Sequence, residues 1–184
     1  ETVSYEEGIA YFSKLDQRFP EIKMMEMGPT DCGLPLHLVL YSADQDFDIQ
    51  SNREKGKAII LINNAIHPGE PDGVDASMMI LRDIAQKVLL DKEVQDVLLA
   101  IIPFYNIGGA LNRNAYSRAN QNGPKEYGFR GNSRNYDLNR DFIKNDTRNA
   151  RSFAGIFHYL DPDIFLDTHV SNGADYQYVI TLIS

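Results

Sequence analysis

The sequence predicts an α/β domain with three layers, in which helices cover both sides of a central mixed, largely parallel sheet. Apolar, strand-like runs alternate with amphipathic, helix-like runs through most of the 184 residues. Two of the strand-like runs, 59–62 and 97–104, are continuous in apolar residues, as strands buried on both faces are. Each ends in a polar turn, and ligands bind beyond such strand ends in open α/β sheets.

The composition is typical of a globular protein. With 43% hydrophobic residues, the length suits a single domain over residues 1–184. The sequence has no run of eighteen apolar residues, so it predicts no membrane span. Acidic residues outnumber basic ones by 26 to 18, and the net charge of −8 argues against general nucleic-acid binding. Cys32 is the single cysteine, so no internal disulfide can form.

One segment, 113–140, is basic although the chain as a whole is acidic. It holds six basic residues and two acidic ones, a local charge of +4. A basic segment of this kind is either a solvated loop or a site that captures a small anion such as a carboxylate. The charge pattern leaves both interpretations open.

The chain opens with a predicted amphipathic helix. Ser4 and Glu7 have the spacing of a capping box, and apolar residues then recur at helical spacing until Pro20 ends the run. Two strand-like runs follow, 22–27 and 36–41. Glycines and prolines separate them, which predicts a hairpin.

The polar residues 42–57 are predicted to form a surface loop before the strand 59–62. Pro71 suits the first turn of a second helix, since its missing N–H has no helical partner there. The apolar face of this helix is expected to consist of Val74, Met78, Leu81, Ala85 and Val88. His37 lies among alternating apolar residues, so we interpret it as a strand residue and not as a ligand.

In the second half, residues 107–136 are rich in glycine and have no sustained period, which predicts a loop of about thirty residues. Loops of this length inside compact domains are usually functional. Asn145 or Asp146 is then expected to cap a helix. Strands are predicted at 164–168 and 178–183.

Three polar side chains follow predicted strands and suit a metal ion. His67 and Glu70 lie three residues apart in the turn after 59–62, and His169 follows 164–168. Zinc binds imidazole nitrogen and carboxylate oxygen at about 2.0–2.2 Å, and a catalytic zinc has three protein ligands and one open position. The His-x-x-Glu pair alone is a weak signal.

The motifs together resemble the zinc carboxypeptidases (M14, carboxypeptidase A-like). The matching features occur in the family's order: His67-Pro-Gly-Glu70 after a strand, Arg130, Asp137-x-Asn139-Arg140, and His169 at the end of a later strand. The resemblance implies a zinc carboxypeptidase-like fold. It also implies hydrolysis of the C-terminal peptide bond of a substrate with a free carboxylate, by a zinc-activated water.

The resemblance also implies a role for each matching residue. Zinc would be the cofactor, bound by His67, Glu70 and His169. Arg130 would stabilise the developing oxyanion, with Arg134 as the alternative. Asn139 and Arg140 would bind the terminal carboxylate of the substrate. Asp137 would accept the other N–H of the first zinc histidine, or it is simply a cap or turn residue.

The sequence departs from the family after His169. The general-base glutamate and the substrate-binding tyrosine of the family lie well beyond the third ligand, but only fifteen residues follow here, and none is a glutamate. Tyr176 and Tyr178 come too early to match. We therefore expect a truncated domain that is inactive or poorly active by itself. The predicted strand 178–183 would leave an exposed sheet edge open to self-association.

Two other functions remain open. One is an N-acyl amino acid amidase or deacylase of the aspartoacylase-like branch, and the other is a non-catalytic pseudoenzyme that binds carboxylates. The long loop after Asn106 and the spacing of Arg130 favour the carboxypeptidase. The habit of the family and the start at Glu1 suggest an extracytoplasmic location, periplasmic or secreted.

Overall fold

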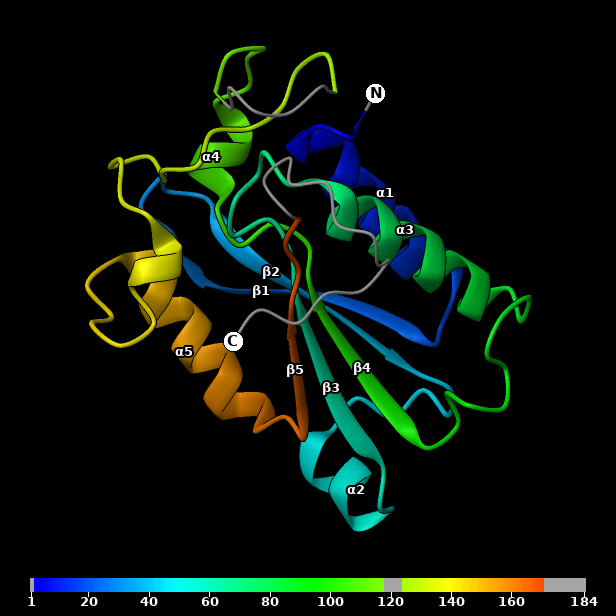
Figure 1. Ribbon diagram of the computed structural model, residues 1–184. Coiled ribbons are helices and arrows are strands. Elements are labelled where there is room, and N and C mark those ends of the chain that lie inside the picture. The colour runs from blue at the N-terminus through cyan, green and yellow to red at the C-terminus, as the bar shows by residue number, and fades with distance from the viewer. Residues whose placement is uncertain (1, 118–123, 171–184) are drawn as a thin grey trace, which may run out of the picture.

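The computed structural model describes residues 2–117 and 124–170 (Figure 1). The helices are α1 (Tyr5–Arg18), α2 (Ile49–Glu54), α3 (Asp72–Ala85), α4 (Ile107–Leu111) and α5 (Arg148–Leu160), with a short 3-10 helix, η1 (Leu138–Arg140). The strands are β1 (Ile22–Pro29), β2 (Pro35–Ser42), β3 (Ala58–Asn63), β4 (Val97–Ile102) and β5 (Ile164–Asp167).

These five strands form one mixed sheet in the order β1-β2-β4-β3-β5. β1, β2 and β4 pair antiparallel, whereas β4, β3 and β5 pair parallel. The predicted α/β class with a mixed sheet is thus confirmed. Because β3, β4 and β5 run the same way, their carboxyl ends meet at one edge of the sheet.

Helices cover both faces of the sheet (Figure 1). Successive strand residues point to opposite faces. Leu38 and Leu40 of β2 pack in the cluster that contains Phe153 and Ile156 of α5. Val39 and Tyr41 pack in the second cluster, with apolar residues of α1 and α3. This arrangement confirms the three-layer architecture.

Two helices lie in segments predicted as loops. Within 42–57 the chain forms α2, because the Asp48 carboxylate caps it by accepting the N–H of Ser51 at 2.7 Å. Within 107–136 it forms α4, where the Asn106 side chain accepts the N–H of Gly109 at 2.8 Å. Both are short helices begun by one polar cap, and neither has enough turns to show a hydrophobic period.

Two predicted helix boundaries were wrong. The helix after Pro71 ends at Ala85, and Val88 lies beyond it with 71% of its surface exposed. The cap of α5 is Thr147, whose side chain accepts the N–H of Ala150. Asn145 and Asp146 precede that cap, and the carboxylate of Asp141 accepts the amides of Asp146 and Thr147, which places the start of the helix after both predicted residues.

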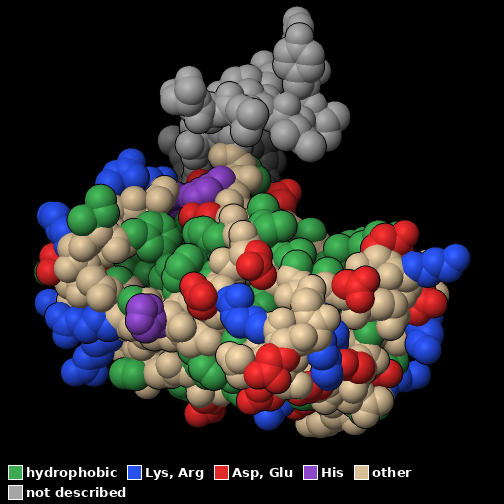
Figure 2. All heavy atoms as spheres, turned by 90° about the horizontal axis from the view of Figure 1, so that it is seen from below, with side chains coloured by type: hydrophobic (Ala, Val, Ile, Leu, Met, Phe, Trp, Pro, Cys, Tyr) green, Lys and Arg blue, Asp and Glu red, His purple; other side chains and the backbone are tan. Residues whose placement is uncertain are grey.

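The outermost strand of the described sheet on one side is β5. Its apolar residues are partly exposed, from 38% at Phe165 to 50% at Leu166. Figure 2 shows hydrophobic side chains gathered on the face that it displays. The predicted strand 178–183 lies outside the described residues, so self-association through it stays a prediction. No helix in the described part combines the length and apolar character needed to cross a membrane.

Candidate metal centre

The turn after β3 buries a histidine and a glutamate side by side. The amide of Glu70 donates to the carbonyl of His67 at 2.8 Å, which closes a tight turn immediately before α3. Only 2% of the surface of each residue is exposed. An imidazole and a carboxyl group removed from water in this way need partners, since burial of unpaired polar groups is unfavourable.

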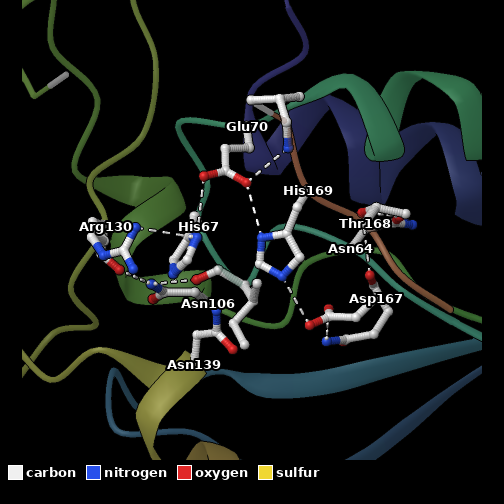
Figure 3. Close-up of polar contacts among 12 residues, drawn as sticks. Asn64, His67, Glu70, Asn106, Arg130, Asn139, Asp167, Thr168 and His169 are labelled. Carbon is white, nitrogen blue, oxygen red and sulfur yellow. Dashed lines mark hydrogen bonds and ion pairs between the residues drawn. The ribbon is translucent and has the colours of Figure 1, made fainter. Parts of the chain in front are cut away.

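His169 meets this pair from β5, because β5 is the parallel neighbour of β3. The Glu70 carboxylate lies between the two imidazole rings (Figure 3). Its Oε1 is 3.2 Å from Nδ1 of His67, and its Oε2 is 3.0 Å from Nδ1 of His169. One ligand atom from each of the three residues lies within 4.8 Å of the others.

These separations suit a metal ion. Ligand atoms at about 2.0–2.2 Å from a tetrahedral zinc lie about 3.3–3.6 Å from one another. The two contacts of Glu70, at 3.2 and 3.0 Å, are close to that spacing. Two imidazoles and one carboxylate are also a donor set that zinc accepts. The residues present therefore fit zinc.

The far side of each imidazole contacts an aspartate. Nε2 of His67 is 3.2 Å from Oδ1 of Asp137, and Nε2 of His169 is 3.1 Å from Oδ2 of Asp167. A carboxylate at Nε2 favours the tautomer that carries its proton there, and this leaves Nδ1 free to ligate. Both Nδ1 atoms face Glu70.

Hydrogen bonds with Asp167 and Glu70 raise the pKa of His169 to about 9, more than its burial lowers it. In the metal-free chain His169 is therefore protonated at neutral pH, and a metal ion would displace that proton. Burial alone would raise the pKa of Asp137. Hydrogen bonds from His67 and Arg130 outweigh burial, so the pKa of this carboxyl lies below its ordinary value.

Arg130 lies against Asp137. Its Nε and Nη2 are 3.0 and 2.9 Å from Oδ2 of Asp137, and its Nη1 is 3.5 Å from Nδ1 of His67. Asn106, the cap of α4, donates through Nδ2 to the carbonyl of Arg130 at 2.9 Å and to the carbonyl of Ile66 at 3.3 Å. Asn106 thus ties the long loop to the turn that carries His67 (Figure 3).

Asp137 also caps η1, because its Oδ1 accepts the N–H of Asn139 at 3.0 Å. Both interpretations offered from the sequence thus describe real contacts of this carboxylate. The same Oδ1 also contacts Nε2 of His67, so Asp137 links Asn139 to the metal centre; Figure 3 labels both residues. Arg140 is exposed, and its guanidinium donates to the carbonyl of Asn139 at 2.9 Å. It lines a surface pocket of about 320 Å³ together with Asp137 and other residues.

Arg134, the alternative to Arg130, and His37, interpreted as a strand residue, make other contacts. Arg134 stacks over the ring of Tyr136, 5.0 Å from its centroid, and lies 3.8 Å from Asp31. His37 lies on β2, opposite Glu26 of β1. Burial lowers the pKa of His37, as for a neutral histidine within a sheet.

Sequence reasoning missed Asp167 and its partner Asn63. The signal was present, since Asp167 precedes His169 by two residues and alternate strand residues face the same side. Asn63 is the last residue of β3, and its Nδ2 donates to Oδ1 of Asp167 at 2.9 Å.

A family model described as zinc carboxypeptidase, Peptidase M14, matches residues 9–176. This chain belongs to the zinc carboxypeptidase family. Among solved structures, it is similar to a metallo-carboxypeptidase from Burkholderia cenocepacia, with a TM-score of 0.70 and 19% identity over 95% of this chain and 43% of that one. It is also similar to carboxypeptidase A from Helicoverpa armigera, with a TM-score of 0.69 and 17% identity over 91% of this chain and 45% of that one.

A third similar structure is a metallo-carboxypeptidase from Pseudomonas aeruginosa in complex with (2-guanidinoethylmercapto)succinic acid. It has a TM-score of 0.69 and 16% identity over 94% of this chain and 41% of that one. At these identities the likeness shows the fold. The present chain spans less than half the length of each of these three solved chains. Comparison with curated proteins finds no match.

Proposed function

We propose that this chain carries the zinc centre and part of the substrate site of a metallocarboxypeptidase that removes the C-terminal residue of a peptide. One observation carries the proposal: in a member of the zinc carboxypeptidase family, ligand atoms of His67, Glu70 and His169 converge within 4.8 Å. Catalytic zinc sites use three protein ligands of these types. When bound, zinc supplies a Lewis acid that activates water near neutral pH.

Arg130 is the proposed donor to the oxygen that becomes negative as the peptide bond is attacked. A guanidinium is permanently charged and planar, so it stabilises an oxyanion without a proton transfer. Here it is paired with Asp137 and reaches to 3.5 Å from Nδ1 of His67. The proposal requires Arg130 to swing from these contacts toward the substrate carbonyl, while Asp137 keeps its bond to His67.

Asn139 and Arg140 are the proposed binding site for the substrate carboxylate. In the described part of the chain, Arg140 has no carboxylate partner within salt-bridge distance, and its guanidinium can bind both oxygens of an incoming carboxylate. Arg134 and Lys144 line the same pocket of about 320 Å³. Asp137, Asp141 and Asp146 line it too, so the proposal rests on the guanidinium of Arg140 and not on a net positive charge of the pocket.

We propose that the chain by itself hydrolyses peptides slowly. No glutamate follows His169 in the sequence to act as the general base of the family. General acid–base help typically contributes about 10²–10⁴-fold to the rate. Substrate binding does not depend on that group, so binding and turnover are expected to separate.

The test uses the zinc-loaded chain and two peptides that differ only at the C-terminus, one a free acid and one an amide. We expect the free acid to bind at least about tenfold more tightly, because only it carries the carboxylate for Arg140. Slow release of its C-terminal residue, measured by mass spectrometry, would support a peptidase. Equal binding of both peptides would refute the proposal.

The same assay separates the two other functions left open by the sequence. Hydrolysis of N-acetyl amino acids, with no release from peptides, would instead indicate an amidase or deacylase. Tight binding of the free-acid peptide with no turnover of either substrate class would show that these 184 residues bind a carboxylate without hydrolysing the peptide, as the pseudoenzyme alternative requires.

A further inference from the structure

We propose that Asp167 is a positioning residue that holds His169 in the orientation needed to ligate a metal, and that Asn63 in turn fixes Asp167. The inference rests on the proposed metal centre and adds a second carboxylate–histidine pair to it. The family resemblance gave Asp137 to His67 as such a partner. For His169, the contacts in the structure point to Asp167.

The geometry of Asp167 is that of an orienting group. Its Oδ2 lies 3.1 Å from Nε2 of His169, on the side of the ring opposite Nδ1. The Nδ1 atom faces Glu70 at 3.0 Å. The ring is therefore held at both nitrogens, and a turn of the imidazole by 180° about the Cβ–Cγ bond would place carbon atoms at both positions and lose both contacts.

Pairing of β3 with β5 places Asp167. The two strands pair in parallel with Asn63 opposite Asp167, so the aspartate is fixed by the sheet itself. The Asn63 side chain is fully buried, and its Nδ2 donates to Oδ1 of Asp167 at 2.9 Å. A flipped amide would put its oxygen against the carboxylate, so the carboxylate selects the amide orientation.

The side-chain amide of Asn63 is buried and only partly hydrogen-bonded, which indicates that its contact with Asp167 has a role. Among the described residues, Oδ1 of Asn63 has no hydrogen-bond partner, which is unfavourable at a fully buried site. A leucine or valine would fill the end of a buried strand without that cost. The contact that Asn63 does make is the one that holds Asp167.

The two aspartates differ in what neutralises them. Asp137 is paired with the guanidinium of Arg130 at 2.9 Å. In the described residues, the side-chain partners of Asp167 are His169 and the neutral amide of Asn63. The negative charge of Asp167 therefore acts mainly on His169, and it makes the imidazole of His169 a more basic metal ligand.

The decisive variant is Asp167→Asn, which removes the charge but keeps the size. Its amide oxygen can still accept from Nε2 of His169, and its NH2 can donate to Oδ1 of Asn63 once that amide turns. Loss of a partner of this kind typically weakens metal affinity by about 10–100-fold. We expect that loss in the zinc Kd of the 184-residue chain, measured by competition with a chelator.

The matched control is Asp163→Asn at the opposite end of β5. Asp163 accepts the N–H of Ile59 at 2.8 Å, so its loss perturbs the same strand pairing without touching the imidazole. We expect its zinc Kd to stay within about twofold of wild type. Equal zinc affinities for Asp167→Asn and wild type would overturn the inference. If wild type itself binds no zinc, the proposed function fails first.

A second measurement tests the orientation of His169 in the wild type first and then in the variant. In the zinc-loaded wild type, the ¹⁵N shifts of His169 should show a proton on Nε2 and the metal on Nδ1. In Asp167→Asn, we expect the Nε2 proton to exchange faster with water, because its acceptor is weaker. A proton on Nδ1 in the zinc-loaded wild type would contradict the proposed orientation.

Discussion

The carboxylate of Asp141 joins the turn that bears Asn139 and Arg140 to the start of α5. Its Oδ1 accepts the N–H of Asp146 at 2.9 Å. Its Oδ2 accepts the N–H and the hydroxyl of Thr147 at 2.9 and 2.6 Å. Only 5% of its surface is exposed. We predict that Asp141→Asn destabilises the fold through these three bonds.

The magnitude follows from the number of acceptors. Asparagine keeps one oxygen, which can retain both bonds from Thr147, but its NH2 then faces the N–H of Asp146. One bond to a charged group is lost, and such bonds contribute about 1.5–3 kcal/mol each. We therefore expect a loss of about 2–3 kcal/mol in the free energy of unfolding at pH 7.

The effect has a defined pH dependence. Burial would raise the pKa of Asp141, but hydrogen bonds from Thr147 and Asp146 outweigh it and hold the pKa below the ordinary 3.8. A depressed pKa in the folded state stabilises the fold above the unfolded pKa. That contribution is lost as the pH falls through the folded pKa. The difference between wild type and Asp141→Asn should be constant from pH 7 to about 5 and should shrink below about 4.

Urea unfolding at pH 7, 5 and 3.5 measures this difference. At pH 7 we expect the midpoint of Asp141→Asn to fall by about 1 M. Asp146→Asn is the matched control in the same loop, where the side chain is exposed, and should change stability by less than about 0.5 kcal/mol. Similar losses in both variants, or a difference that grows as the pH falls, would refute the reasoning.

Two further predictions concern packing and substrate binding. Gly73→Ala should lower the melting temperature, because a Cβ there would clash with Thr168 Oγ1 and Asn64 Oδ1, whereas Gly155→Ala on α5 meets open space and should raise stability by about 0.5–1 kcal/mol. Equal shifts in thermal unfolding would contradict the close approach of α3 to the end of β5. Arg140→Lys should weaken binding of a free-acid peptide about tenfold, because an ammonium cannot bind both carboxylate oxygens, while Arg134→Lys should not. Isothermal titration calorimetry measures both affinities. A larger loss of affinity in Arg134→Lys than in Arg140→Lys would indicate that the carboxylate binds at Arg134 instead.

The central part of the fold could be predicted from the sequence because its strands are continuous apolar runs. The runs 59–62 and 97–104 correspond to β3 and β4, buried in the sheet. The short helices α2 and α4 could not be predicted, since each rests on one capping side chain and packs too few residues to show a period. The cap of α5 also depended on a contact across the turn, from Asp141.

For the site, the positions of His67 and His169 after two strands foretold that they would lie together, because parallel strands end at one edge of the sheet. The sequence could not show the partners of each ring. The hydrogen bond that Asp167 accepts from His169 depends on which side chains at the end of β5 face the metal centre. The pairing of Arg130 with Asp137 depends on side-chain conformations that spacing does not encode.

Zinc binding by the purified chain tests the central claim most directly. Titration of zinc into wild type at neutral pH, followed by competition with a chelator, should give about one ion per chain. His169→Ala removes one of the three ligands and should weaken binding by more than about 100-fold, beyond the loss of an outer partner. A chain that binds no zinc, or that binds it equally well without His169, would contradict the account.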